Sequence, residues 1–196
     1  MKIRIATLDD ALSIQKIYAY YVVNTDISFE YDVPSVDEMK ERIKVTDPYL
    51  VAEIDNQVVG YAYASQFRSR IGYQYSYELS VYIDKDYHRQ GIAKELYIKL
   101  FEILKVMNIQ TLYACITYPN QKSEEFHKRF GFKKVGHLHR CGYKFNEWLD
   151  VIYMEKYLLD YHKITEIIPF CDISDALITE ILYSNDKDYG MIDKKG

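Results

Sequence analysis

The chain has few cysteines, no long apolar run and no excess of positive charge. Its three cysteines, Cys115, Cys141 and Cys171, are widely spaced and form no C-x-x-C pair, which argues against a disulfide framework and a zinc site. No stretch of about 18 apolar residues is present, the length that a membrane-spanning helix needs. The opening residues MKIRIATLDD also lack the apolar segment of a signal peptide. We therefore expect a cytoplasmic protein with no membrane partner and no metal.

The charge and composition narrow the class of protein further. A formal net charge of −4 argues against a general nucleic-acid-binding protein, which would normally carry a basic face. Apolar residues make up 48% and charged residues 28% of the chain, which are ordinary proportions for a soluble globular protein. A length of 196 residues suits a single domain with a substantial core.

Apolar periodicity in the first half of the chain predicts two helices and three strands. Residues 2–7 alternate as a short strand, and Thr7 with Asp10 forms a capping box that starts a helix through about Val23. Ser35 caps a second helix over 36–45, and segments 49–54 and 57–65 read as a hairpin. Apolar residues recur at helical spacing along the first helix, at Leu12, Ile14, Ile17, Tyr18 and Tyr21.

The second half continues the alternation after an irregular segment, 67–75. Residues 77–83 alternate as a strand, and the most regular helix covers 91–107 with one apolar stripe. A strand over 111–117, a helix over 120–130 and strands over 132–139 and 149–158 complete the pattern. Because hairpins are mixed with strand–helix alternation, we expect an α/β (α+β) protein with a mixed sheet.

The last part of the chain differs in character from the rest. Residues 1–158 hold the complete strand and helix pattern and are expected to form one domain. Residues 159–196 are then a C-terminal extension, part helical from about Ser174 with Asp172 or Ser174 as the cap, and ending in a polar tail over 185–196.

The segment HRQGIA, residues 88–93, joins the strand over 77–83 to the long helix. Small residues at Gly91 and Ala93 allow a ligand to approach the backbone closely. The free amides of the first helical turn lie at the positive end of the helix dipole, an arrangement that suits a phosphate or pyrophosphate. An ordinary tight turn is the alternative. Neither G-x-x-x-x-G-K-[ST] nor G-x-G-x-x-G is present.

The order of these motifs resembles the GNAT acyltransferase superfamily. The pattern Q/R-x-x-G-x-G/A precedes a long helix, and N-x-x-S-x-x-F-H-x-x-F-G-F follows the next strand. Four stretches narrow the resemblance to the phosphinothricin acetyltransferase-like branch, namely residues 24–31, 63–83, 119–132 and 142–154. The last of them carries the distinctive pattern G-[YF]-K-x-x-x-W-x-D-V. The likeness runs from about residue 2 to 158.

This resemblance implies the GNAT fold, a single mixed, largely antiparallel central sheet of about seven strands with helices on both faces. It also implies acetyl-CoA as cosubstrate, with its pyrophosphate on the loop amides. His88 stands where the motif usually has Gln or Arg, at a position that contributes mainly its backbone amide. Asn120, one of the implied cofactor-binding residues, is also a good N-cap after Pro119. The implied cofactor-binding residues are Val81, Tyr82, Ile83, His88, Arg89, Gln90, Gly91, Ile92, Ala93, Asn120 and Ser123.

Two residues match catalytic positions of the branch. Glu78 matches the glutamate proposed as base, and partial burial among Tyr75, Tyr77 and Tyr82 would raise the pKa of its carboxyl. The alternative is an outward charge on a strand. His127 falls where many GNAT enzymes have a tyrosine that protonates the leaving thiolate, and this branch has histidine there. A packed, hydrogen-bonded histidine is an equal alternative.

The acceptor site is expected in the irregular segment before Glu78. Arg68 and Arg70 suit an anion bound in bidentate fashion, with a solvated loop as the alternative. Phe29, Tyr73 and Trp148 are candidate walls of the pocket, with core packing equally supported. The family's acceptors are small α-amino acids such as phosphinothricin or methionine sulfoximine and sulfone, and the expected assembly is a homodimer.

Two other functions stay open. The same fold could acetylate a peptide amine, a polyamine or an aminoglycoside, which would require a more open groove than a small amino acid does. A non-catalytic acetyl-CoA-binding module is the second alternative. The presence of both Glu78 and His127 speaks against that module.

Overall fold

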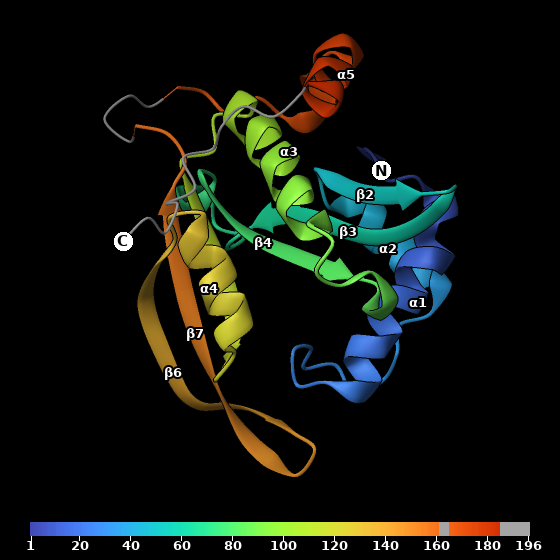
Figure 1. Cartoon of the computed structure of the whole chain (residues 1–196). Coiled ribbons are helices and arrows are strands. Elements are labelled where there is room, and N and C mark those ends of the chain that lie inside the picture. The colour runs from blue at the N-terminus through green and yellow to red at the C-terminus, as the bar shows by residue number, and fades with distance from the viewer. Residues whose placement is uncertain (161–164, 185–196) are drawn as a thin grey trace, which may run out of the picture.

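A mixed sheet forms the centre of the computed structural model, which describes residues 1–160 and 165–184. Within these residues one seven-stranded sheet has the strand order β1-β2-β3-β4-β5-β7-β6 (Figure 1). Within it β4 and β5 pair in parallel, and the other neighbours pair antiparallel. The mixed, largely antiparallel sheet expected from the sequence is confirmed. Its strands are β1 (Lys2–Ile5), β2 (Tyr49–Ile54), β3 (Gln57–Gln66), β4 (Ser76–Ile83), β5 (Thr111–Tyr118), β6 (Lys133–Lys144) and β7 (Glu147–Tyr157).

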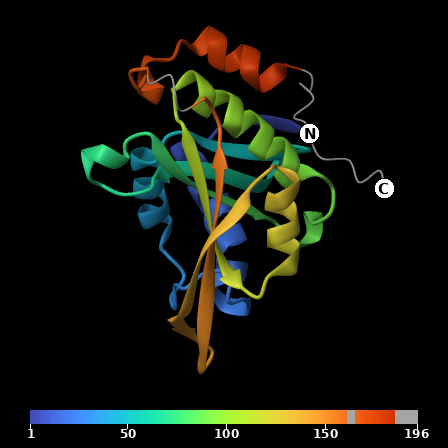
Figure 2. The ribbon, with the colours of Figure 1, turned by 90° about the vertical axis from the view of Figure 1, so that its left-hand side faces the viewer.

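Helices cover both faces of the sheet, as the two views show (Figures 1 and 2). On one face lie α1 (Ala11–Asn24) and α2 (Val36–Val45), which bury an aromatic-rich cluster against β2 and β3. On the other face lie α3 (Ile92–Val106), α4 (Gln121–Arg129) and α5 (Asp175–Tyr183). The larger core cluster lies on that second face, around α3.

The predicted capping signals begin α1 and α2 as expected. The Thr7 amide donates to the Asp10 carboxylate at 2.7 Å, closing a 3₁₀ turn over Leu8–Asp10 that leads into α1. The Glu38 amide donates to Ser35 Oγ at 3.2 Å and so caps α2. The expected apolar stripe of α1 was wrong at Leu12, which is 49% exposed. Ala11, one residue earlier, is fully buried instead and belongs to the core cluster on this face of the sheet.

The hairpin of β6 and β7 is longer than its sequence pattern indicates. The predicted strands stopped at 139 and resumed at 149, whereas the observed ladder continues to the turn at Phe145 and Asn146. Those two residues take left-handed φ angles of 52° and 64°. The alternation is hidden in the sequence because the register shifts twice along β6.

The described part of the C-terminal extension packs on the face that carries α3. The helix expected from about Ser174 begins at Asp175, with Ser174 as its N-cap. Two apolar side chains of this helix, Ile178 and Ile181, and Ile173 just before it belong to the core cluster around α3. Lys99 Nζ of α3 donates to the Ser184 carbonyl at 2.6 Å. The boundary at residue 158 stays a prediction, and the expected polar tail over 185–196 lies outside the described residues.

No helix within residues 1–160 and 165–184 is both long enough and apolar enough to cross a membrane.

Candidate active site

Strands β4 and β5 separate part-way along the sheet. They pair in parallel at three positions, of which Glu78 opposite Tyr113 is the last. Beyond that point β4 stays paired with β3 to Ile83, while β5 stays paired with β7 to Tyr118. The two strands therefore diverge from this point, and Glu78 lies at their last paired position.

Backbone alternation decides which residues of β4 face this gap. The Tyr75 carbonyl accepts from Gln110 and Thr111 on the β5 side, whereas the Asp84 amide donates to Val59 on the β3 side. Because successive residues of a strand present their backbone groups to opposite sides, Val81 faces the gap and Tyr82 faces β3. Of the three β4 residues expected to bind the cofactor, Val81, Tyr82 and Ile83, it is Val81 whose backbone groups are open to the gap. The Ile83 amide and carbonyl are bonded to Tyr21 Oη at 3.2 and 2.6 Å.

The HRQGIA loop has the geometry expected of an anion site. Gly91 has φ of 81°, a left-handed conformation that glycine adopts at little cost, and it is the N-cap of α3. The Glu95 amide donates to the Gly91 carbonyl at 3.2 Å, so the amides of Ile92, Ala93 and Lys94 precede the first helical bond. The His88 ring instead turns back to the Ile83 carbonyl, 3.1 Å away.

A groove of about 670 Å³ lies between this loop and α4. Its lining combines four cationic side chains with one carboxylate, Glu125, and several apolar surfaces. Because the cations flank the first turn of α3, the groove suits a ligand with several phosphates. Gln90, predicted from the motif, is exposed and lies outside the lining. The cations are Arg89, Lys94, Lys122 and Arg129.

Asn120 and Ser123 begin α4. The Ser123 amide donates to Asn120 Oδ1 at 3.1 Å, so Asn120 is the N-cap that its sequence position indicated. This bond uses the carboxamide oxygen and leaves the NH₂ group available to a ligand. Neither residue lines the groove.

His127 is buried on the inner side of α4. Its Nδ1 lies 2.8 Å from the Ser123 carbonyl oxygen. Because a carbonyl oxygen can only accept a hydrogen bond, Nδ1 must be the donor and carries the ring proton. Its Nε2 then accepts from Tyr97 Oη at 3.0 Å. Burial lowers the pKa of His127 from 6.5 to about 4. Both ring nitrogens are thus occupied in a neutral side chain, and the geometry favours the packed histidine over the proton donor.

Glu78 points to the face of the sheet that carries α1 and α2. Burial raises the pKa of its carboxyl, and the positive charge of Arg68 opposes that rise. Among its expected aromatic neighbours, Tyr77 packs on the opposite face in the core around α3. Tyr63 lies close enough to Glu78 for the carboxylate to contribute to its raised pKa.

Arg68 and Arg70 lie in the irregular segment before β4, and their two side chains have different surroundings. Together with Phe67, Ser69 and Tyr73 they line an open pocket of about 570 Å³. The Arg68 guanidinium lies over the Phe67 ring, 4.9 Å from its centroid, and its charge reaches Glu78. Arg70 has no such influence on the Glu78 carboxyl.

The other two expected pocket walls lie elsewhere. Phe29 packs over Gly142 of β6, where a Cβ atom would overlap its ring. Trp148 is 63% exposed on the β6–β7 hairpin, with its ring 5.2 Å from that of Tyr143. It therefore belongs neither to the pocket that contains Arg68 nor to the core.

Comparison with known proteins identifies the family. Residues 3–153 match the model of the acetyltransferase (GNAT) domain. A phosphinothricin N-acetyltransferase of Alcaligenes faecalis is 37% identical over 159 residues, covering 79% of this chain and 81% of the relative. The chain belongs to the GNAT acetyltransferases. Its sequence places it in their phosphinothricin acetyltransferase-like branch.

Two further relatives agree with this placement. A GNAT superfamily phosphinothricin acetyltransferase of Sinorhizobium meliloti, solved in complex with acetyl-CoA, is 32% identical with a TM-score of 0.77. The alignment covers 80% of this chain and 87% of that one. An L-methionine sulfoximine/L-methionine sulfone acetyltransferase of Salmonella typhimurium is 28% identical and covers 79% of this chain and 93% of the relative.

The motif that distinguishes this branch of GNAT acetyltransferases has a structural role here. Lys144 is buried, and its Nζ donates to the carbonyls of Val22, Thr25 and Ser28 at 2.7, 2.9 and 2.6 Å. Gly142 makes room for the Phe29 ring on the same loop. The hairpin therefore holds the loop after α1 in place. Gly142 and Lys144 of the motif contact that loop and are not catalytic residues.

Sequence reasoning missed several residues of this candidate site. Lys122 and Arg129 enter the groove because α4 lies beside the α3 amino end, a juxtaposition that no spacing in the sequence reveals. Cys115 and Tyr153 form a hydrogen-bonded pair whose pKa values are both influenced by the Glu78 carboxylate. The alternation of β5 beyond Tyr113 could have indicated that Cys115 faces the same side as Glu78.

Proposed function

We propose that this chain transfers the acetyl group of acetyl-CoA to the primary amine of a small amino-acid-like acceptor, of the phosphinothricin or methionine sulfoximine/sulfone type. One observation carries the proposal. A half-buried carboxylate, Glu78, lies where β4 and β5 part, within reach of the positive charge of Arg68. A base within electrostatic range of an anion-binding cation suits an acceptor that has both an amine and a carboxylate. The names of the relatives point to the same class of acceptor.

The cofactor-binding residues follow from the groove. Its four cations and the free amides of Ile92, Ala93 and Lys94 suit the phosphates of acetyl-CoA. The backbone of Val81, open to the gap, would bond the pantetheine amides, and the Asn120 NH₂ group can add a further bond. When bound, acetyl-CoA supplies a thioester as the acetyl donor.

Glu78 is the proposed base. An amine reaches its binding site mostly as an ammonium, so a proton must leave before its nitrogen can attack the thioester carbon. Glu78 takes that proton directly or through a water molecule. The leaving group is a thiolate, the conjugate base of a thiol with a pKa of about 8.5. Such a weakly basic thiolate can leave without being protonated by an acid. This agrees with the neutral state of His127, whose two ring nitrogens both form hydrogen bonds.

Arg68 is the proposed clamp for the acceptor carboxylate. Its guanidinium is braced by the rings of Phe67 and Tyr73, at 4.9 and 6.0 Å from their centroids. Because it is near Glu78, a carboxylate bound to it would hold the neighbouring amine close to the base. Arg70 lines the same pocket without this relation to Glu78 and serves as a matched control.

The test combines an acceptor screen with two variants. L-amino acids and their sulfone and sulfoximine analogues are screened for acceptor-dependent release of CoA thiol, and the best one is used for kinetics. The clamp binds ground and transition states alike, so Arg68→Ala should raise KM for the acceptor more than it lowers kcat. Loss of a charge-assisted bond corresponds to roughly 10- to 150-fold in KM. Arg70→Ala should change KM much less.

Other outcomes would change the acceptor or the class. If the amino acids are inactive while peptide amines or polyamines release thiol, the acceptor proposal is wrong and the acetyltransferase stands. If no amine releases thiol while acetyl-CoA still binds, the non-catalytic module becomes the better account.

We also propose that the protein is a homodimer. Several large apolar side chains are exposed on the β6–β7 hairpin, and such patches commonly mark interfaces. Sedimentation velocity would show a dimer at micromolar protein concentration if this is correct. The exposed residues are Val135, Leu138, Tyr143, Phe145 and Trp148.

A further inference from the structure

A β-bulge in the hairpin gathers two histidines around one carboxylate. The register of β6 and β7 shifts between Leu138 and Gly142, so several residues of β6 lie opposite Asp150 alone. Arg140, at the centre of the bulge, has a left-handed φ of 48°. Its amide donates to Asp150 Oδ1 at 2.8 Å. One oxygen of Asp150 thus closes the bulge, and the other stays free of the backbone.

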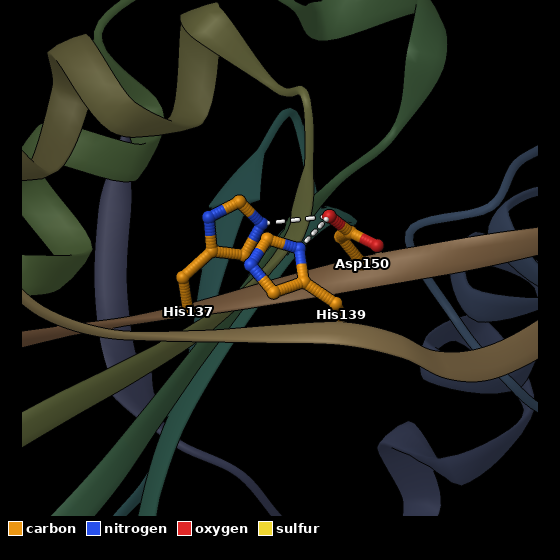
Figure 3. Close-up of side chains that lie close together, drawn as sticks. All are labelled: His137, His139 and Asp150. Atoms are coloured by element: carbon orange, nitrogen blue, oxygen red, sulfur yellow. Dashed lines mark hydrogen bonds and ion pairs between the residues drawn. The ribbon is translucent and has the colours of Figure 1, made fainter.

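That second oxygen is the meeting point of the two imidazoles. His137 Nε2 lies 2.8 Å and His139 Nδ1 2.9 Å from Asp150 Oδ2. Figure 3 shows both rings turned toward the same carboxylate oxygen from one side of the hairpin. The two rings lie 4.1 Å apart between centroids. The three potential ligand atoms all lie within 4.8 Å of one another.

We propose that His137, His139 and Asp150 bind a divalent transition-metal cation of the Zn²⁺ type. Two imidazole nitrogens and one carboxylate oxygen form a donor set that such cations prefer, and one that Mg²⁺ and Ca²⁺ do not. With metal–ligand bonds of about 2.0–2.1 Å, neighbouring ligand atoms lie roughly 2.9–3.4 Å apart. The two nitrogen–oxygen separations already approach that range. The His139 side chain is 72% exposed and free to complete the closure, with water filling the remaining positions.

The groups around the cluster set the conditions for binding. Lys134 Nζ lies 3.4 Å from His137 Nδ1 and over the Tyr118 ring, 4.7 Å from its centroid. Its positive charge opposes a cation at the cluster. When His137 binds metal through Nε2, its proton moves to Nδ1, and the exposed ammonium of Lys134 must turn away to solvent. We therefore expect Lys134 to weaken the site without being a ligand.

The site lies apart from the proposed acetyl-transfer chemistry. Asp150 is opposite Tyr118 on β5, whereas Glu78 is opposite Tyr113, five residues earlier on that strand. At about 3.3 Å per residue the two sites are roughly 16 Å apart along β5. A bound cation would join both strands of the bulge. Beyond the bulge lies Lys144, which holds the loop after α1, so the cation would stabilise that docking contact.

The test uses untagged full-length protein and three matched forms. Isothermal titration with Zn²⁺ in buffer free of chelators should show one site per chain in the wild type. His139→Ala removes one ligand from an exposed position and should weaken binding at least about 10-fold. Lys134→Gln keeps all three ligands, removes the nearest cation and should bind Zn²⁺ at least as tightly as the wild type. Zn²⁺ should also raise the Tm of the wild type and of Lys134→Gln, but not that of His139→Ala.

Three results would overturn the proposal. They are the absence of binding to the wild type, equal binding by His139→Ala, and a loss in Lys134→Gln as large as that in His139→Ala. Equal binding of Mg²⁺ or Ca²⁺ would also contradict it, because the donor set should exclude both.

Discussion

Glu78 and Arg68 are electrostatically linked: burial raises the pKa of the Glu78 carboxyl, and the positive charge of Arg68 opposes that rise. The two residues lie on different segments, the irregular loop before β4 and the strand itself. Two opposing effects therefore set the protonation of the proposed base, and the same arginine is the proposed clamp for the acceptor. A single substitution can separate these two roles, because one appears in KM and the other in the pH dependence.

The first prediction concerns that pH dependence. The base must be ionised to accept a proton, so kcat/KM should rise with pH through the pKa of Glu78 in the free enzyme, above the ordinary glutamate value of 4.5. Arg68→Ala removes the effect that lowers this pKa, so the acidic limb of the profile should move to higher pH. Arg70→Ala should leave the limb in place. An unmoved limb in Arg68→Ala would show that the titrating group is not Glu78.

The second prediction concerns the loop at the start of α3. A Cβ atom at Gly91 would meet no protein atom within 4 Å, so a side chain there disturbs only the backbone, held at φ of 81°. Gly91→Val should nevertheless abolish acetyl-CoA binding, because a β-branched residue resists this conformation and would displace the first-turn amides. Calorimetry on the folded variant measures the affinity. Gly72→Val is the control, since Gly72 also faces open space but lies in the irregular segment before β4, away from the start of α3. Near-wild-type affinity in Gly91→Val would remove the argument for an anion site.

The third prediction separates the two roles of His127. Its folded-state pKa of about 4 lies below the unfolded value of 6.5, so the unfolded chain binds the extra proton first as the pH falls. The stability that depends on neutral His127 is complete above pH 6.5 and is lost down to about pH 4. Near pH 5 the loss should amount to about 2 kcal/mol.

Urea unfolding of the wild type and of His127→Gln at neutral and acidic pH measures this difference. The variant should lose less stability on acidification, and its kcat near neutral pH should stay within about 10-fold of the wild type. A large fall in kcat with an unchanged pH dependence of stability would restore the role of proton donor.

Much of the architecture could be predicted from the sequence because its signals are local. Capping residues such as Ser35 and Ser174, and the glycine at 91, act on their own helices and marked the helix starts correctly. The hairpin end was missed because the two register shifts of β6 interrupt the period of two. Leu12 was wrongly placed in the core because Ala11 and Leu12 are adjacent apolar residues at the start of the helix, and the sequence does not show which of them faces inward.

The candidate site was predictable only where a motif lies in one segment. The loop around Gly91 and the carboxylate of Glu78 each lie on a recognisable strand–turn–helix or strand pattern. Lys122 and Arg129 reach the groove through the packing of α4 beside α3, which depends on contacts between distant segments. The role of Lys144 was hidden for the same reason, since its three carbonyl partners lie more than a hundred residues earlier in the chain.

Glu78→Gln tests the central claim most directly. The amide cannot take a proton from the ammonium, so kcat should fall by about 10²-fold or more near neutral pH while acetyl-CoA affinity is kept. The rate should recover in part at higher pH, where the acceptor is already a free amine. Steady-state kinetics across pH, with calorimetry for the cofactor, provides both quantities. A variant with wild-type kcat and an unchanged pH–rate profile would show that Glu78 is not the base and would contradict the proposed mechanism.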